Sequence, residues 1–150
     1  MTSLRRYYLL FLICCIALTL LVGVIAALLP ANIATALTAI PYLITINIVL
    51  FRFIKNEKRA PTQIERKKMT LSFLLIFWAY NIGGVLLSLC FFAYSDPEIM
   101  KSFLIYIQNM QFISLIVIII LVVSIPLYLV TYWLYGKHAQ RMAERMLNMS

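Results

Sequence analysis

Four long apolar runs, separated by short polar segments, dominate the hydrophobic pattern of this sequence. The first, Tyr7–Leu29, has 23 residues without a charge and would form a helix about 34 Å long. Runs of this length match the roughly 30 Å hydrocarbon core of a bilayer. We therefore predict an all-α, polytopic membrane protein with a single four-helix domain over residues 1–150. The predicted membrane spans cover about 7–29, 32–53, 69–94 and 112–135.

Helix start and stop signals lie between these runs. Pro30 cannot continue the first helix, and Asn32 is a suitable N-cap for the second. The segment Thr62–Glu65 has the spacing of a capping box, and Asp96–Glu98 combines an N-cap, a proline at the first helical position and an acid in the first turn. A cleaved signal peptide is the alternative for the first run, but that run exceeds a usual signal core and a second span follows closely.

Three segments lie outside the predicted spans. Residues 54–68 form a basic loop, and residues 97–111 form an amphipathic outer segment that is either an interfacial helix or an extension of the fourth span. The tail, 137–150, is basic and amphipathic, with a second stripe of methionines at 142, 146 and 149. We interpret this tail as a helix at the anionic inner leaflet, or alternatively as a docking helix that contacts a partner through its methionines.

The distribution of positive charge fixes the predicted orientation. The chain is 64% hydrophobic and only 12% charged, with a net charge of +8. Of its 13 Lys and Arg residues, twelve lie in the N-terminus, the 52–68 region and the tail, and one, Lys101, lies in the outer segments. Because Lys and Arg beside a span stay on the cytoplasmic side, we predict a protein of the bacterial inner membrane with both termini in the cytoplasm. Since the basic residues lie in short segments beside the spans, we predict no nucleic-acid partner. Ten basic residues are predicted to contact the inner leaflet or a partner: Arg52, Lys55, Lys58, Arg59, Arg66, Lys67, Lys68, Lys137, Arg141 and Arg145.

Four polar residues lie at similar depths within the predicted spans. Thr19, Thr38, Asn81 and Ser124 are each 13 or 14 residues from the nearest inner basic residue, which corresponds to roughly 20 Å along a helix. They could form a shared polar layer near mid-membrane, or they could be ordinary inter-helix contacts worth about 0.6 kcal/mol each. The adjacent Gly83–Gly84 pair could form a notch that lets another helix approach closely.

The sequence contains no motif that names a reaction. The interiors of the spans carry no ionisable residue of the kind that ion-coupled transporters use, and no paired catalytic groups are evident. Cys14, Cys15 and Cys90 lie inside apolar runs, where they are expected to act as small apolar side chains. We expect no enzyme activity, no cofactor and no metal site.

Two motifs suggest a family. The basic segment 58–62 with 65–68, followed by a span containing Phe77-Trp78 and Tyr80-Asn81, resembles a family of short bacterial four-helix inner-membrane proteins labelled ABZJ. That resemblance covers nearly the whole chain. It implies an integral membrane protein without an assigned activity and carries over no catalytic residues.

The sequence therefore supports two functional hypotheses. The first is an accessory, assembly or lipid-associated protein that acts by contact with anionic lipids, other membrane proteins or further copies of itself. The alternative is a small oligomeric facilitator or channel for a neutral solute.

Overall fold

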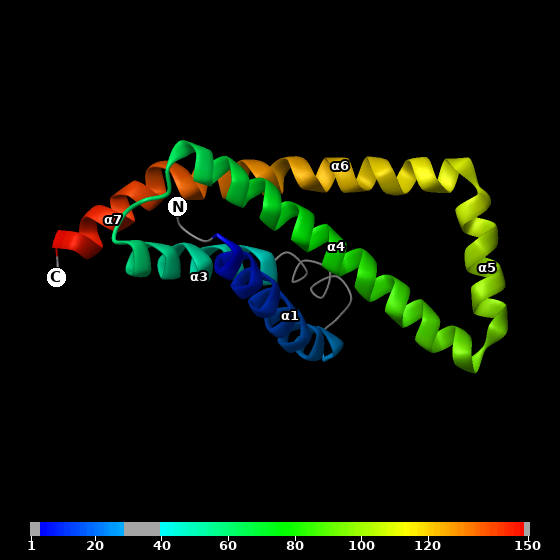
Figure 1. The fold of residues 1–150 in the computed structure, drawn as a ribbon. Helices are drawn as coiled ribbons and strands as arrows, with labels where there is room; N and C mark the ends of the chain where they lie inside the picture. The colour runs from blue at the N-terminus through cyan, green and yellow to red at the C-terminus, as the bar shows by residue number, and fades with distance from the viewer. Residues whose placement is uncertain (1–3, 29–39, 149–150) are drawn as a thin grey trace.

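The computed structural model describes residues 4–28 and 40–148, and all of the regular structure within them is helical. Figure 1 shows the arrangement of the elements. Their bounds are α1 Arg5–Ala27, α3 Ile40–Glu57, α4 Gln63–Ser95, α5 Pro97–Gln108, α6 Met110–Trp133, the π-helix η1 Leu134–His138 and α7 Ala139–Asn148. The predicted all-α class is confirmed for these residues.

Three helical stretches are long and apolar enough to cross a membrane: Arg5–Ala27, Gln63–Tyr94 and Met110–Met146. These stretches contain the third and fourth predicted spans and cover the first, 7–29, as far as Ala27; residue 29 lies outside the described residues. The second predicted span, 32–53, is described only from Ile40, where α3 begins, and α3 carries Arg52, Lys55 and Glu57. Residues 32–39 of that span, including Asn32 and Thr38, lie outside the described residues, as does Pro30.

The capping signals are confirmed at Thr62 and Asp96, the two predicted helix starts within the described residues. The Glu65 backbone N–H donates to Thr62 Oγ1 at 3.3 Å, and the Thr62 N–H donates to Glu65 Oε2 at 2.9 Å, which completes the capping box. At the start of α5, Asp96 Oδ1 accepts from the Glu98 N–H at 3.0 Å. These bonds satisfy N–H groups that the first turn of a helix leaves free.

Residues 97–111 are not a continuous extension of the fourth span. Helix α5 ends at Gln108, and Asn109 leaves the helical conformation with φ −81° and ψ 108°. The Asn109 side chain then caps α6 by accepting from the Gln111 N–H at 3.0 Å. The outer segment is therefore a separate helix with its own N-cap and its own end.

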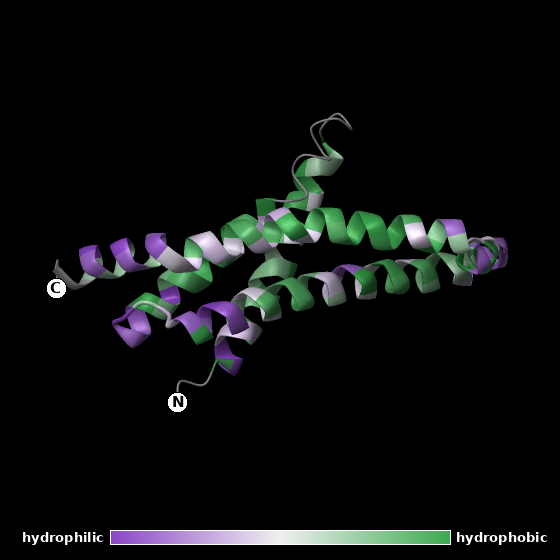
Figure 2. Cartoon of the chain, turned by 90° about the horizontal axis from the view of Figure 1, so that it is seen from above, coloured by the Kyte–Doolittle hydropathy of each residue, from purple (hydrophilic) through white to green (hydrophobic). Residues whose placement is uncertain are grey.

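The buried core lies at one end of the molecule. It joins α1, α3, the first turns of α4, η1 and α7, and its centre is aromatic. The Phe73 ring stacks on Phe11 at 4.4 Å between centroids and meets the rings of Tyr8 and Tyr135 edge-on. Figure 2 shows that hydrophilic residues gather around this end, over α7 and the start of α4, and again at α5. We call the region that contains this core the packed end.

Helix α7 packs onto the packed end. Ala139 and Ala143 are buried, and Met142 and Met146 pack against the core. The two methionines therefore contact this chain's own core, which argues against the interpretation of the tail as a free docking helix; Met149 lies outside the described residues.

The other end of the molecule is open. Helices α4 and α6 diverge from the packed end, and α5 bridges their far ends, so that the three helices enclose a triangle (Figure 1). Beyond Phe73, no described residue of α4 is fully buried, and Thr131 is the one buried residue of α6. We call this region the open end.

Candidate functional site

A groove between α4, α5 and α6 is the principal concave feature of the open end. Its volume is about 580 Å³, within the range of about 300–1,000 Å³ usual for ligand pockets. Nearly all of its lining is apolar. It is lined by Trp78, Asn81, Ile82, Val85 and Leu86 of α4, by Phe103 and Ile107 of α5, and by Phe112, Ile116, Ile119 and Ile120 of α6.

The apex of this groove is a hydrogen bond between two helices. Trp78 Nε1 donates to Ser124 Oγ at 2.8 Å and so links α4 to α6 where they begin to separate. Sequence analysis placed Ser124 among the mid-membrane polar residues and assigned no such role to Trp78. One signal in the sequence points to this bond. An indole N–H within an apolar span needs a hydrogen-bond acceptor, and Ser124 is one of the few side chains at a similar depth in the predicted membrane that can accept it.

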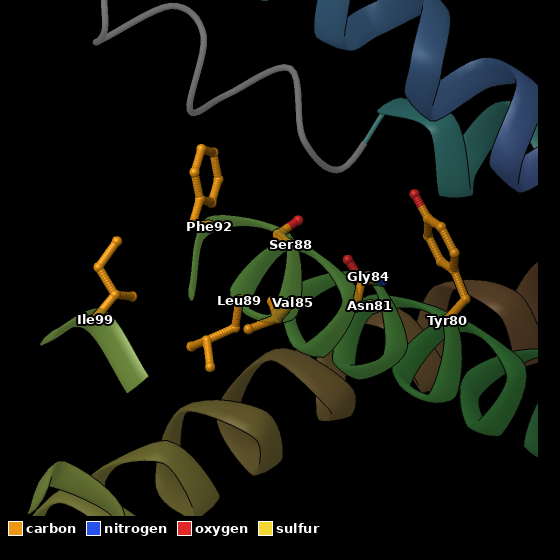
Figure 3. Close-up of a pocket in the computed structure, with 8 residues that line it drawn as sticks. All are labelled: Tyr80, Asn81, Gly84, Val85, Ser88, Leu89, Phe92 and Ile99. Carbon is orange, nitrogen blue, oxygen red and sulfur yellow. The ribbon is translucent and has the colours of Figure 1, made fainter. Parts of the chain in front are cut away.

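A second cavity of about 530 Å³ lies along α4, and Figure 3 shows its lining side chains. Tyr80, Asn81, Ser88 and Phe92 project from the same side of α4 in this view. Gly84, Val85, Leu89 and Ile99 complete the lining. Asn81 and Val85 therefore line both cavities.

The predicted mid-membrane polar layer is not joined by hydrogen bonds. The Asn81 amide Nδ2 donates to the Phe77 carbonyl one turn earlier on the same helix, at 2.7 Å. Ser124 pairs with Trp78, Thr38 lies outside the described residues, and among the described residues no hydrogen bond connects Thr19 to Asn81 or Ser124. The Asn81 bond stays within α4, whereas Ser124 joins α6 to α4 through Trp78.

The predicted glycine notch is unoccupied by any described part of the chain. A Cβ built on Gly83 or Gly84 would meet no heavy atom within 4 Å. The close helix approach that these residues would permit is therefore not used between the helices described here.

The predicted basic contact residues divide into two groups. Arg59 and Arg66 make contacts within the chain, whereas the other eight are exposed around the packed end. Both nitrogens at the tip of Arg59 donate to the Glu65 carboxylate, at 2.7 and 2.8 Å, and the guanidinium lies over the Phe53 ring. This pairing, with the capping bonds, lowers the pKa of Glu65 from 4.5 to about 2.

Arg66 holds the bend between α6 and α7. Its Nε donates to the Tyr132 carbonyl, and its guanidinium lies 3.5 Å from the centre of the Tyr132 ring. The bend itself is η1, where Gly136 has φ −99° and ψ −116°. A Cβ on Gly136 would lie 2.5–2.8 Å from the Arg66 guanidinium, so only glycine leaves room for this arrangement. Arg66 is thus a structural residue more than a surface contact.

Buried hydroxyls also connect α3 to α6 and η1, and sequence analysis did not identify them. Thr131 Oγ1 donates to the Leu127 carbonyl, so the 2.8 Å bond between Tyr42 and Thr131 has the tyrosine as donor. The Tyr135 hydroxyl donates to the Ile46 carbonyl at 3.0 Å. Tyr42 follows Pro41, and Tyr135 lies two residues before Lys137, but nothing in their spacing indicates these partners.

No protein-family model, curated protein or solved structure matches this chain. The resemblance to the family labelled ABZJ therefore stays a prediction. Among the residues that the structure describes, no group of three or more His, Cys, Asp or Glu side chains is placed to hold a metal ion.

Proposed function

We propose that this chain is a multi-pass protein of the bacterial inner membrane, with four spans and both termini in the cytoplasm, that acts by contact and not by catalysis. In this proposal it is an accessory, assembly or lipid-associated subunit. Its exposed basic residues would face the anionic inner leaflet, and its open end would face lipids, other membrane proteins or further copies of the chain.

The observation that carries this proposal is the near absence of buried side chains along α6. This helix is strongly apolar, and Thr131 alone among its residues is buried. Side chains such as Leu121, 57% exposed, and Val122, 61% exposed, are left more than half uncovered by the described chain. Large exposed apolar surfaces mark membrane or protein contacts, and here they lie on the same helices that are long enough to span a bilayer.

Photocrosslinking in intact membranes tests the contact hypothesis. A photoreactive phenylalanine analogue at Leu87, 74% exposed on α4, or at Leu121 is expected to give discrete adducts with a membrane protein or lipid. The same analogue at Phe73, which is fully buried, serves as the matched control and should give none. Diffuse labelling at Leu87 and Leu121, together with an unchanged profile of membrane complexes in a deletion strain, would contradict the proposal.

Cysteine labelling tests the orientation separately. In a background with Cys14, Cys15 and Cys90 replaced by alanine, a membrane-impermeant maleimide added to cells with a permeable outer envelope should label Lys101→Cys. It should leave Lys67→Cys unlabelled until the inner membrane is disrupted. Labelling of Lys67→Cys from outside would reverse the predicted topology, because both positions are exposed in the structure.

A facilitator of a neutral solute is the second candidate, and the position of Asn81 favours it. Asn81 lines both cavities of α4, and its amide is the principal polar group shared between them. In liposomes that contain the purified chain, glycerol entry followed by light scattering should then exceed that of empty liposomes. Asn81→Val should reduce the rate. An absent rate, or one that Asn81→Val leaves unchanged, rejects this candidate.

A further inference from the structure

We propose that the groove between α4, α5 and α6 binds an acyl chain of a membrane phospholipid from the leaflet on the α5 side. This inference goes beyond the contact function proposed above. It requires that α4 and α6 lie in a membrane and does not depend on any protein partner.

The chemistry of the lining fits hydrocarbon. Trp78 and Asn81 are the two lining residues with polar side-chain groups. The Trp78 N–H is bonded to Ser124 Oγ, and one Asn81 N–H is bonded to the Phe77 carbonyl. Water or a polar ligand in the groove would have few hydrogen-bond partners, because most of the lining side chains are apolar. An apolar ligand leaves few polar groups unpaired there, because the Trp78 N–H and one Asn81 N–H are already bonded within the chain.

The groove is short enough to lie within one leaflet. Along α6 the lining runs from Phe112 to Ile120, eight residues or roughly 12 Å, which fits within one half of a hydrocarbon core of about 30 Å. Ser124, the acceptor of the Trp78 bond, lies one turn beyond the end of this lining. Ser124 is 13 residues from Lys137, the first basic residue after α6, so the apex lies roughly 20 Å from the basic end. A phospholipid acyl chain also begins at the headgroup level and ends near the bilayer midplane.

The closed ends of the groove distinguish an acyl chain from a helix of a partner. The Trp78–Ser124 bond closes the apex, and α5, with Phe103 and Ile107 against the groove, bridges the other end (Figure 1). A transmembrane helix about 10–12 Å wide must continue through both leaflets, so it would have to pass through one of these closures. An acyl chain enters sideways between α4 and α6 and stops at the apex.

Quenching of Trp78 fluorescence by brominated lipid provides the test. Trp133 is the other tryptophan of the chain, so a Trp133→Phe variant reports Trp78 alone. The full chain is reconstituted into vesicles of phosphatidylcholine with bromine atoms midway along the acyl chains. Trp78 is expected to be quenched by these lipids and protected from aqueous iodide.

A groove-filling variant separates a bound acyl chain from surrounding lipid. Ile116→Phe adds bulk to the lining, so quenching of Trp78 should fall to roughly half or less of the original value. Ile118→Phe, on an exposed position of α6 outside the lining, is the matched control and should leave quenching unchanged. Helical circular dichroism and elution in mild detergent verify that both variants are folded.

Each other outcome overturns the inference. Equal quenching of Trp78 in all variants would mean that the ring faces bulk lipid, and quenching by iodide would mean that the groove holds water. Quenching by neither agent would mean that protein covers the groove. Trp133 in a Trp78→Phe variant measures membrane insertion independently, because Trp133 is 61% exposed near the end of α6. A quenched Trp133 with an unquenched Trp78 would leave the membrane assignment intact and reject the bound acyl chain.

Discussion

The packed end and the open end share helix α4, yet apolar side chains are buried at the first and exposed at the second. On α4, Phe73 is fully buried, whereas Leu87, fourteen residues later, is 74% exposed. The packed end combines stacked aromatic rings with buried hydroxyl bonds. The open end has mainly aliphatic side chains. Between helices in lipid there is little hydrophobic driving force, so shape and hydrogen bonds decide which surfaces associate.

The largest expected difference between the two ends concerns a single ring. Phe73→Ala should lower the free energy of unfolding by about 3 kcal/mol, because the cavity among Phe11, Tyr8 and Tyr135 cannot refill. The matched change Leu87→Ala should cost below about 0.5 kcal/mol. Unfolding in mixed detergent micelles, followed by circular dichroism, measures both. Equal losses would contradict the division into a packed and an open end.

The bend at Gly136 is the next feature to test. Gly136→Ala should displace the Arg66 guanidinium from Tyr132 and cost about 1–2 kcal/mol of stability, since a charged hydrogen bond and a cation–π contact are both lost. In an Arg66→Met background, where the guanidinium is absent, the same change should cost clearly less. Additive losses in this double-mutant cycle would show that Arg66 does not explain the requirement for glycine.

The buried hydroxyl pair between α3 and α6 should have a smaller effect. Tyr42→Phe and Thr131→Val are expected to show a coupling of about 0.6 kcal/mol in a double-mutant cycle, typical of hydrogen bonds between membrane helices. The same unfolding measurement applies. A coupling near zero would assign the stability of the packed end to ring packing alone.

The smallest expected effect depends on pH. The pKa of Glu65 is about 2 in the folded chain and 4.5 in its ordinary state, so its pairing with Arg59 stabilises the chain fully above pH 4.5. This contribution is lost as the pH falls from 4.5 toward 2. Glu65→Gln should therefore flatten the decline in stability over that interval while leaving the open end unaffected. An unchanged pH profile in the variant would mean that other carboxylates cause the decline.

Local signals along the chain predict helix starts well. The capping box at Thr62 and the cap at Asp96 depend on residues within one turn, so the sequence contains everything that determines them. That α5 is a helix separate from α6 was one of two predicted alternatives. Asn109, the N-cap of α6, is the residue that decides between them. Within the described residues, the predicted long apolar helices were located to within a few residues of their observed bounds.

Contacts between helices could not be predicted in the same way. Arg66 was grouped with the surface cations because charge beside a span indicates an interface, but a guanidinium also binds a free carbonyl at a π-helix. The Trp78–Ser124 bond joins residues 46 positions apart, and no periodicity indicates such a pair. Equal depth grouped Asn81 with Ser124 and Thr19, yet depth does not specify the direction in which a side chain points.

Helix α5 has a consequence for the shape of the whole molecule. Two Asx caps, at Asp96 and Asn109, delimit its twelve residues, which together form a strut about 18 Å long. Because α5 joins the far ends of α4 and α6 (Figure 1), its length sets the angle between these two helices. Removing one turn from α5 should therefore bring the far ends of α4 and α6 closer together and narrow the angle between them.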